Sequence, residues 1–303
     1  MIRVLLADSL SLKAIEQLKE IPEFEIIEKP EPTADELKTE IGCCDAVVVR
    51  SATKLTKEIL ATASDLKLIV RAGIALDNVD VPFARERGIE VRNTPFATSI
   101  TVAEYTLALM LGICRFIGPA YQSMKQHRWD KKEFSKGTEL YGKTAGIIGF
   151  GRIGKELAKR ELALGMRVVF CDVLDIQTDI DADQVPMDVL LRTADFISIH
   201  LPLNESTRGL ISKSKFAQMK PEAVLVNVSR GGVVDEDALL SALQENQLKA
   251  VAIDVYEKEP PDNYALIDQE NVFPAPHLGA STIEGQERAG LDVLSILKEF
   301  FNV

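Results

Sequence analysis

The chain has 303 residues, of which 46% are hydrophobic, and this is enough to bury two ordinary domain cores. Its formal net charge of −11 argues against a nucleic-acid-binding surface, because such surfaces neutralise phosphates with lysine and arginine. An anionic ligand would therefore need a local basic pocket in an acidic molecule.

The sequence predicts neither a secretion signal nor a membrane span. The N-terminal run MIRVLLADSL reaches Asp8 too early for the apolar region of a signal peptide. Residues 98–117 are apolar but include Glu104 and Arg115, which are costly at a bilayer centre. The four cysteines form no C-x-x-C pair and no disulfide framework. We therefore expect a cytoplasmic protein that binds neither membrane nor metal.

Short apolar runs alternate with helical patterns over residues 1–93. A helix is expected from residue 12, and Thr33 with Glu36 forms a capping box that opens another helix ending at Gly42. Continuous apolar runs suit a parallel sheet that is covered on both faces. Strands are therefore expected at 3–6, 24–27, 46–49, 68–70 and 89–91.

The alternation restarts after a single long helix, which is expected at 98–117. A last helix, at 283–301, is long enough to return to the first unit. Repetition of the βαβ pattern in both halves predicts an α/β protein with two doubly wound parallel-sheet domains. The second set of strands is expected at 145–148, 168–171, 196–200, 224–228 and 251–255.

A glycine turn follows the strand at 145–148 and precedes a helix. Gly149, Gly151 and Gly154 give the pattern G-x-G-x-x-G in the strand–turn–helix context that dinucleotide binding requires. Asp172 closes the next strand, where a carboxylate accepts hydrogen bonds from ribose hydroxyls and repels a 2′-phosphate. A turn-capping aspartate is the alternative interpretation. The pattern favours NAD over NADP as cofactor.

Oxidation of a hydroxy acid needs a base, a cation for the carboxylate and a group that orients the base. Of the three histidines, His277 lies in a proline-rich loop, whereas His127 lies in a lysine-rich stretch and His200 ends a strand. Arg230 and Glu259 each follow a predicted strand, at the sheet edge where α/β proteins bind ligands. Taken singly, a surface salt bridge, a solvated turn and a loop histidine explain Arg230, Glu259 and His277 equally well.

Together, several segments resemble one known family over nearly the whole chain. They are Arg50-Ser51-Ala52-Thr53-Lys54, Arg71-Ala72-Gly73, Asp77-Asn78-Val79-Asp80, Asn93-Thr94-Pro95, the glycine turn, His200-Leu201-Pro202-Leu203, Asn227-Val228-Ser229-Arg230-Gly231-Gly232 and Pro276-His277-Leu278-Gly279-Ala280-Ser281-Thr282. The chain resembles the D-isomer-specific 2-hydroxyacid dehydrogenases, and among them the phosphoglycerate type. The resemblance implies a Rossmann NAD-binding domain (94–276) inserted in a flavodoxin-like substrate domain (1–93 plus 277–303).

The same resemblance implies site residues. Arg230, Glu259 and His277 would form the catalytic triad, with His277 as general acid and base. Substrate contacts are implied at Arg50, Ser51, Arg71, Ala72, Gly73, Arg230 and His277. NAD contacts are implied at Gly149, Gly151, Arg152, Ile153, Gly154, Asp172, His200, Leu201, Pro202, Val228, Ser229, Arg230, Asp254, His277, Gly279 and Ala280. The chain departs from the family pattern at Ile74-Ala75, where a side-chain hydroxyl contact is lost.

By resemblance we expect NAD-dependent oxidation of D-3-phosphoglycerate, the first step of phosphorylated serine biosynthesis. Reduction of glyoxylate or hydroxypyruvate is the main alternative, and an NAD-sensing corepressor is a less favoured one. The apolar 98–117 segment predicts a homodimer. Because the chain ends at Val303, no C-terminal regulatory domain is expected.

Overall fold

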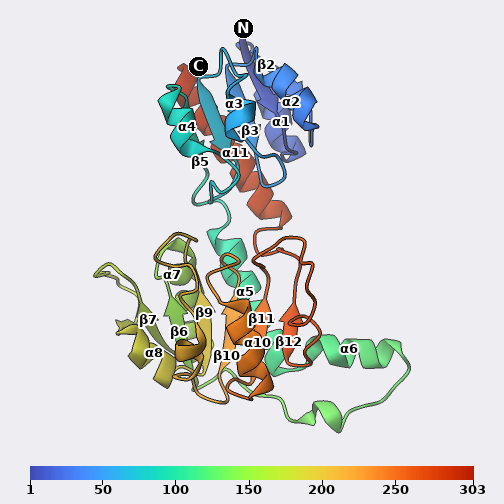
Figure 1. Ribbon diagram of the computed structural model, residues 1–303, viewed down its shortest axis with the longest axis vertical. Coiled ribbons are helices and arrows are strands. Elements are labelled where there is room, and N and C mark those ends of the chain that lie inside the picture. Colours follow the sequence, from blue (N-terminus) through green and yellow to red (C-terminus); the bar gives the residue numbers. More distant parts are fainter. The chain divides into compact units, whose positions relative to one another are not determined.

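The computed structural model describes residues 1–303 and divides them into two compact units, 1–99 with 281–303, and 100–280 (Figure 1). The predicted domain limits at 93/94 and 276/277 lie a few residues before these. The second limit is later because residues 278 and 279 are hydrogen-bonded to Asp254 within the second unit. Each unit contains one parallel sheet, so the predicted fold class, two doubly wound α/β domains, is confirmed.

The first unit has a five-stranded sheet in the order β2-β1-β3-β4-β5, the order of flavodoxin-like folds. Its strands are β1 (Ile2–Leu6), β2 (Phe24–Glu28), β3 (Ala46–Val49), β4 (Leu68–Arg71) and β5 (Glu90–Asn93). Its helices are α1 (Leu12–Lys19), α2 (Ala34–Ile41), α3 (Lys57–Leu60), α4 (Val81–Glu86) and α11 (Ile283–Phe301). The predicted capping box of Thr33 and Glu36 is present at the start of α2.

Alternate strand residues in this sheet point into two separate cores. Leu5, Val47 and Ile69 pack with α2, α3 and α4, whereas Val4 and Val48 pack with α1 and α11. Both faces are therefore covered, which explains why the strands are continuous apolar runs. The last helix thus belongs to the first unit, as its length suggested.

The second unit has a seven-stranded sheet in the order β12-β11-β10-β9-β6-β7-β8. Its strands are β6 (Thr144–Ile148), β7 (Arg167–Cys171), β8 (Ala182–Gln184), β9 (Phe196–Ile199), β10 (Val224–Asn227), β11 (Ala250–Ile253) and β12 (Val272–Pro274). Its helices are α5 (Ser99–Cys114), α6 (Ile117–Lys125), α7 (Arg152–Ala163), α8 (Met187–Thr193), α9 (Lys213–Phe216) and α10 (Glu236–Gln244). The strand order reverses between β6 and β9, the place where such sheets bind ligands.

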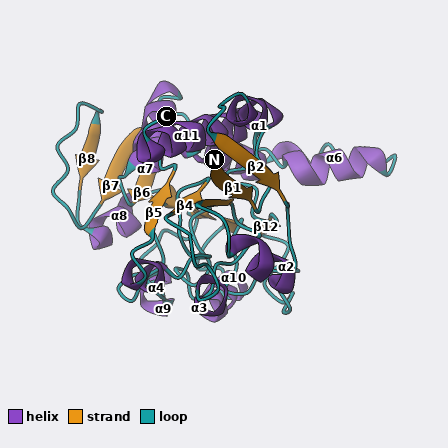
Figure 2. Ribbon diagram, turned by 90° about the horizontal axis from the view of Figure 1, so that it is seen from above, coloured by secondary structure: helices purple, strands orange, loops and turns teal.

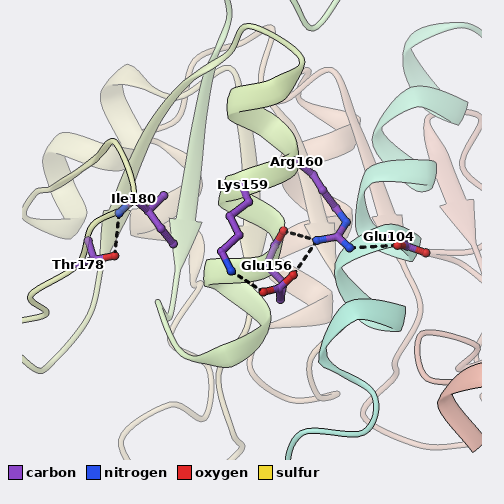
Figure 3. Close-up of polar contacts among 6 residues, drawn as sticks. All are labelled: Glu104, Glu156, Lys159, Arg160, Thr178 and Ile180. Carbon is purple, nitrogen blue, oxygen red and sulfur yellow. Dashed lines mark hydrogen bonds and ion pairs between the residues drawn. The ribbon is translucent and has the colours of Figure 1, made fainter. Parts of the chain in front are cut away.

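One face of this sheet packs against α5 and α7, and the other against α8, α9 and α10. Arg160 on α7 binds Glu104 on α5 at 3.0 Å and Glu156 on its own helix at 2.9 Å (Figure 3). Surface pairs of this kind contribute only about 0–1 kcal/mol each. The apolar contacts therefore hold the two helices on the sheet, and the Arg160–Glu104 pair adds only a small contribution.

The predicted single helix at 98–117 is wrong. α5 ends at Cys114, and α6 begins at Ile117 at an angle of 63°. Phe116 between them adopts a left-handed conformation, with φ of 52°. Pro119 has no N–H to continue α5, but is tolerated in the first turn of α6. α6 consequently projects away from the sheet of its unit (Figure 2).

No single helix is long and apolar enough to span a membrane. The bent pair of α5 and α6 passes that test jointly, on length and composition alone.

Candidate functional site

The glycine turn lies between β6 and α7. Gly149 has φ of +93°, and a Cβ there would lie 2.6 Å from the carbonyl oxygen of His200. A Cβ on Gly154 would lie 2.5 Å from the carbonyl oxygen of Gly149. Side chains at these two positions would therefore force the turn away from β9 or the helix away from β6.

Gly151 differs, because a Cβ there meets no atom within 4 Å. It is the N-cap of α7, and no side chain caps the N–H groups of that helix. An open helix N-terminus with free N–H groups and partial positive charge suits a pyrophosphate. The turn therefore fits the dinucleotide that the sequence predicts.

Asp172 braces the same turn. Its Oδ2 accepts a hydrogen bond from the N–H of Phe150 at 2.8 Å, and its Oδ1 accepts one from Leu174 at 3.1 Å. The turn-capping interpretation is thus correct, but it does not exclude ribose binding, since each carboxylate oxygen can accept a second hydrogen bond. The Asp172 side chain lies beside the glycine turn, which is where dinucleotide-binding domains place the carboxylate that binds the ribose hydroxyls.

His200 follows β9 and is partly exposed, but both of its ring nitrogens are buried. Neither of its ring nitrogens has a hydrogen-bond partner, and burial lowers the pKa of its imidazole to about 3. It is therefore neutral at physiological pH and cannot act as the acid in proton transfer. His127 follows α6 and no strand end, so His277 is the remaining histidine for this role.

His277 and Glu259 form a direct pair. Nδ1 of His277 lies 2.7 Å from Oε2 of Glu259, while Oε1 of Glu259 accepts a hydrogen bond from the N–H of Tyr256 at 3.1 Å. One carboxylate oxygen is thus tied to the backbone and the other to the imidazole. Both side chains are roughly half exposed, at 47% for His277 and 38% for Glu259, so Nε2 remains accessible.

Arg230 lies on a loop that a buried amide organises. Oδ1 of Asn227 accepts hydrogen bonds from the N–H and Oγ of Ser229, at 3.1 and 2.8 Å. Nδ2 of Asn227 donates to the carbonyl oxygen of Arg230 at 3.3 Å. Because Asn227 is 1% exposed, this small network fixes the backbone from which the guanidinium extends.

The loops of Arg230 and Glu259 meet backbone to backbone. A Cβ on Gly231 would lie only 1.8 Å from the carbonyl oxygen of Tyr256, a clash that no relaxation of side chains could relieve. Nearby, Glu236 at the start of α10 accepts a hydrogen bond from the N–H of Glu257 at 2.6 Å. Gly231 and Glu236 therefore set where the Glu259 loop runs relative to Arg230.

Asp254 is completely buried after β11. Its Oδ1 and Oδ2 accept hydrogen bonds from the N–H groups of Leu278 and Gly279, each at 2.8 Å. The sequence suggested a cofactor contact for this residue, which stays a prediction. Its visible role in the structure is to hold the chain directly after His277.

The remaining predicted cofactor residues lie in the same unit. Arg152 and Ile153 occupy the first turn of α7, and the others follow the carboxyl ends of parallel strands: Leu201 and Pro202 after β9, Val228 and Ser229 after β10, and Gly279 and Ala280 after β12. Parallel strands bring these ends to one edge of the sheet. The structure therefore gathers the predicted NAD residues and the triad at one sheet edge of the second unit.

The predicted substrate residues lie in the first unit: 50–51 follow β3, and 71–73 begin at the last residue of β4. Asp8 accepts hydrogen bonds from the N–H groups of Arg50 and Thr53, and Asn78 donates to the carbonyl oxygens of the same two residues. These contacts fix the loop that presents Arg50 and Ser51. Sequence reasoning gave Asp8 no role, although its place at a strand end was a signal.

In the second substrate segment the backbone N–H groups already have partners within the chain. The N–H groups of Ala72 and Gly73 donate to the carbonyl oxygens of Val49 and Arg71, at 2.8 and 2.9 Å. The guanidinium of Arg71 folds over Gly73, where a Cβ would lie 1.6 Å from Nη1. The two backbone donors are therefore engaged within the first unit, and a substrate contact at Arg71 stays a prediction.

Comparisons with known proteins show the family of the chain. Residues 107–279 match the model described as D-isomer specific 2-hydroxyacid dehydrogenase, NAD binding domain. The chain belongs to this family. It therefore carries the family's NAD-binding domain, in the unit that holds the glycine turn.

Three individual proteins illustrate the similarity. A hydroxypyruvate reductase of Thermotoga maritima is 44% identical over 98% of both chains. A D-3-phosphoglycerate dehydrogenase of Methanocaldococcus jannaschii is 43% identical over 99% of this chain, which spans 57% of that protein. The crystal structure of a glyoxylate reductase from Paecilomyes thermophila is 30% identical, with a TM-score of 0.88 over 98% of this chain and 94% of that one.

Proposed function

We propose that the chain oxidises a small D-2-hydroxy acid with NAD, using His277 as the group that moves the hydroxyl proton. The 2.7 Å contact between His277 Nδ1 and Glu259 Oε2 carries this proposal. A carboxylate at Nδ1 fixes the imidazole tautomer and orientation, and it stabilises the imidazolium that forms when Nε2 takes a proton. In the reverse direction the imidazolium returns that proton.

NAD supplies the hydride acceptor when it is bound. The glycine turn and the N-terminus of α7 are suited to its pyrophosphate, and Asp172 to its ribose hydroxyls. Contacts from Leu201, Pro202, Val228, Ser229 and the 277–280 segment belong to the same proposal. Arg230 grips the substrate carboxylate, because a guanidinium forms two parallel hydrogen bonds to such a group.

For the substrate we propose 3-phosphoglycerate. Arg50 is held by Asp8 and by a 3.3 Å bond from its Nη1 to Ser9, which leaves other guanidinium N–H groups for a phosphate. Lys54 lies on the same loop, although it lines a hollow that also contains Glu31 and Glu58. Similarity to phosphoglycerate dehydrogenases supports this choice, with 42–43% identity in the archaeal and rat proteins.

Reduction of hydroxypyruvate is the second candidate. The Thermotoga maritima hydroxypyruvate reductase is 44% identical to this chain, as similar as the Methanocaldococcus jannaschii phosphoglycerate dehydrogenase at 43%. Hydroxypyruvate differs from phosphohydroxypyruvate only in the phosphate. The choice therefore depends on the cations of the first unit rather than on the triad.

Steady-state rates with NADH on phosphohydroxypyruvate, hydroxypyruvate and glyoxylate distinguish these functions. We expect the largest kcat/KM on the phosphorylated substrate and a selective loss of it in Arg50→Gln. The control is Arg85→Gln, on α4 of the same unit. A larger kcat/KM on hydroxypyruvate would assign the second candidate, and no turnover on any of the three would support an NAD-sensing binding protein.

We also propose that two copies associate through α5 and α6. Leu111, Ile117, Tyr121 and Met124 are exposed on these helices, and Trp129 beyond them is 76% exposed. Such apolar exposure on a projecting segment is typical of an interaction surface. Sedimentation should show a dimer that Trp129→Lys weakens, and a wild-type monomer at micromolar concentration would contradict this assignment.

A further inference from the structure

Two carboxylates hold two successive N–H groups of the loop after β11. Oε1 of Glu259 accepts a hydrogen bond from the N–H of Tyr256 at 3.1 Å, and Oε1 of Glu236 accepts one from the N–H of Glu257 at 2.6 Å. Glu259 belongs to this loop, whereas Glu236 is the first residue of α10, the helix that follows the loop of Arg230. The bond from Glu236 therefore ties the loop after β11 to another element of the unit.

The peptide bond between Tyr256 and Glu257 is the point where the two loops meet. Its N–H is held by Glu236, and its carbonyl group lies against Gly231, where a Cβ would be 1.8 Å from the oxygen and 2.7 Å from the Glu257 nitrogen. One peptide is thus packed against the loop between β10 and α10 and hydrogen-bonded to the first residue of α10. A shift of this peptide moves the backbone of Glu259, which follows two residues later.

The start of α10 is itself anchored. Asp235 caps the helix by accepting a hydrogen bond from the N–H of Ala238 at 2.9 Å, and its own N–H donates to the carbonyl oxygen of Ile211 at 3.1 Å. The N–H of Ile211 donates to the carbonyl oxygen of Val233, also at 3.1 Å, and both of these side chains are completely buried. Glu236 therefore extends from a fixed backbone, and the length of its side chain sets where the loop is held.

The surroundings of Glu236 disfavour its negative charge. Burial raises the pKa of its carboxyl group, and the nearby carboxylates of Asp237, Glu257 and Glu259 act in the same direction, while the N–H of Glu257 opposes them. Because the force between Glu236 and Glu259 is repulsive, the hydrogen bond to the N–H of Glu257 is what holds the loop. A carboxamide supplies the same acceptor oxygen without the charge.

We propose that Glu236 is a positioning residue for Glu259 and His277, and that it acts by holding the backbone of the loop after β11. The inference rests on the proposed role of His277 in proton transfer. The path runs from Glu236 to the loop backbone, from there to Glu259, and through the 2.7 Å contact with Nδ1 to the imidazole. The triad itself assigns no role to Glu236.

Three substitutions separate the reach of the Glu236 side chain from its charge. Glu236→Asp keeps the carboxylate but is one methylene shorter, so it should fail to meet the N–H of Glu257. Glu236→Gln keeps the reach and an acceptor oxygen and loses the charge. Asp237→Ala is the matched control, because it removes an exposed carboxylate from the same helical turn.

Hydrogen exchange and kinetics are the two measurements. Glu236→Asp should speed exchange of the Glu257 amide and lower kcat roughly three- to thirtyfold, with little change in KM for the keto acid or in NADH affinity. The effect should fall on kcat because the loop places the imidazole and does not hold the substrate. Glu236→Gln should retain most of kcat and a near-normal exchange rate, and Asp237→Ala should leave both measurements unchanged.

The amide exchange does not depend on turnover, so failure of this inference can be told from failure of the proposed function. Unchanged exchange in Glu236→Asp overturns the inference, and so does faster exchange with an unaltered kcat. Equal losses of kcat in Glu236→Asp and Glu236→Gln would assign the effect to charge and also overturn it. A wild-type protein that reduces no keto acid contradicts the proposed function, and the inference falls with it.

Discussion

Glu259 holds His277 with one carboxylate oxygen and the backbone of Tyr256 with the other, so the imidazole is anchored to the loop that follows β11. That loop is in turn pressed against Gly231, the neighbour of Arg230. The three residues proposed for catalysis come from separate strand ends, yet a continuous set of short contacts relates their backbones. Catalysis should therefore respond to changes in these contacts as well as in the three side chains.

Glu259→Gln should lower kcat by roughly 10²- to 10⁴-fold, because the amide neither fixes the same tautomer nor stabilises the imidazolium. NADH affinity should change little. Stopped-flow or steady-state kinetics with NADH and the best keto acid measure the effect. Glu257→Gln, two residues away with no contact to His277, is the control, and an equal loss in both variants would contradict the orienting role.

Gly231→Ala should lower kcat per folded enzyme molecule, beyond any loss that comes from a smaller amount of folded protein. The added methyl would lie 1.8 Å from the Tyr256 carbonyl oxygen, so the Glu259 loop must move. Overpacking costs about 1–3 kcal/mol, and small misplacements of catalytic groups are costly in rate. Thermal unfolding and kcat are the measurements. Gly118→Ala, where a methyl meets nothing within 4 Å, should preserve both.

Asp172 should govern the preference for NADH over NADPH. Asp172→Ala should weaken NADH binding about tenfold, as loss of a charged hydrogen bond implies. It should also reduce the ratio of the NADPH dissociation constant to the NADH dissociation constant. Asp172→Asn keeps an acceptor for the Phe150 N–H and removes the negative charge that repels a 2′-phosphate. Its affinity for NADPH should therefore increase relative to its affinity for NADH. Fluorescence titration checks this, and an unchanged ratio in both variants would refute it.

Glu161 on α7 predicts a pH-dependent stability. Its side chain is completely buried, neither oxygen has a partner, and burial raises its pKa to about 8. A raised carboxyl pKa means that the unfolded chain loses this proton first. Stability is therefore lost as pH rises from the ordinary glutamate pKa towards 8, by about 5 kcal/mol over the whole shift.

Glu161→Gln removes this titration and should flatten the dependence of Tm on pH between 5 and 8. The variant and the wild type should unfold at similar temperatures near pH 5. Differential scanning fluorimetry across this range is sufficient. Equal slopes for the two proteins would show that the Glu161 carboxyl is not neutral in the folded state.

Much of the fold could be predicted from local sequence patterns. The glycine turn, the Thr33–Glu36 cap and the limits of α11 depend on near neighbours in the chain, and the structure has them where they were expected. The break between α5 and α6 was missed because apolar residues continue across it. The helix nevertheless ends there, because Phe116 adopts a left-handed conformation and Pro119 cannot donate a helical hydrogen bond.

The supporting contacts of the site could not be predicted from spacing alone. Asp254 with Leu278 and Gly231 with Tyr256 are more than twenty residues apart in each case. Such contacts arise from packing between loops, for which a single sequence has no periodic signal. His277 could be singled out because the chain has only three histidines, and Arg230 and Glu259 because they follow predicted strands. No comparable signal marked Asp254 or Gly231 as supports of these residues.

The most direct test is the rate of keto-acid reduction by His277→Ala, measured together with NADH binding. The proposed mechanism predicts that kcat falls at least about 10³-fold while the dissociation constant of NADH stays within a few-fold of wild type. His127→Ala should behave as wild type. A His277→Ala enzyme that turns over at a near-normal rate would contradict the proposal that this imidazole moves the proton.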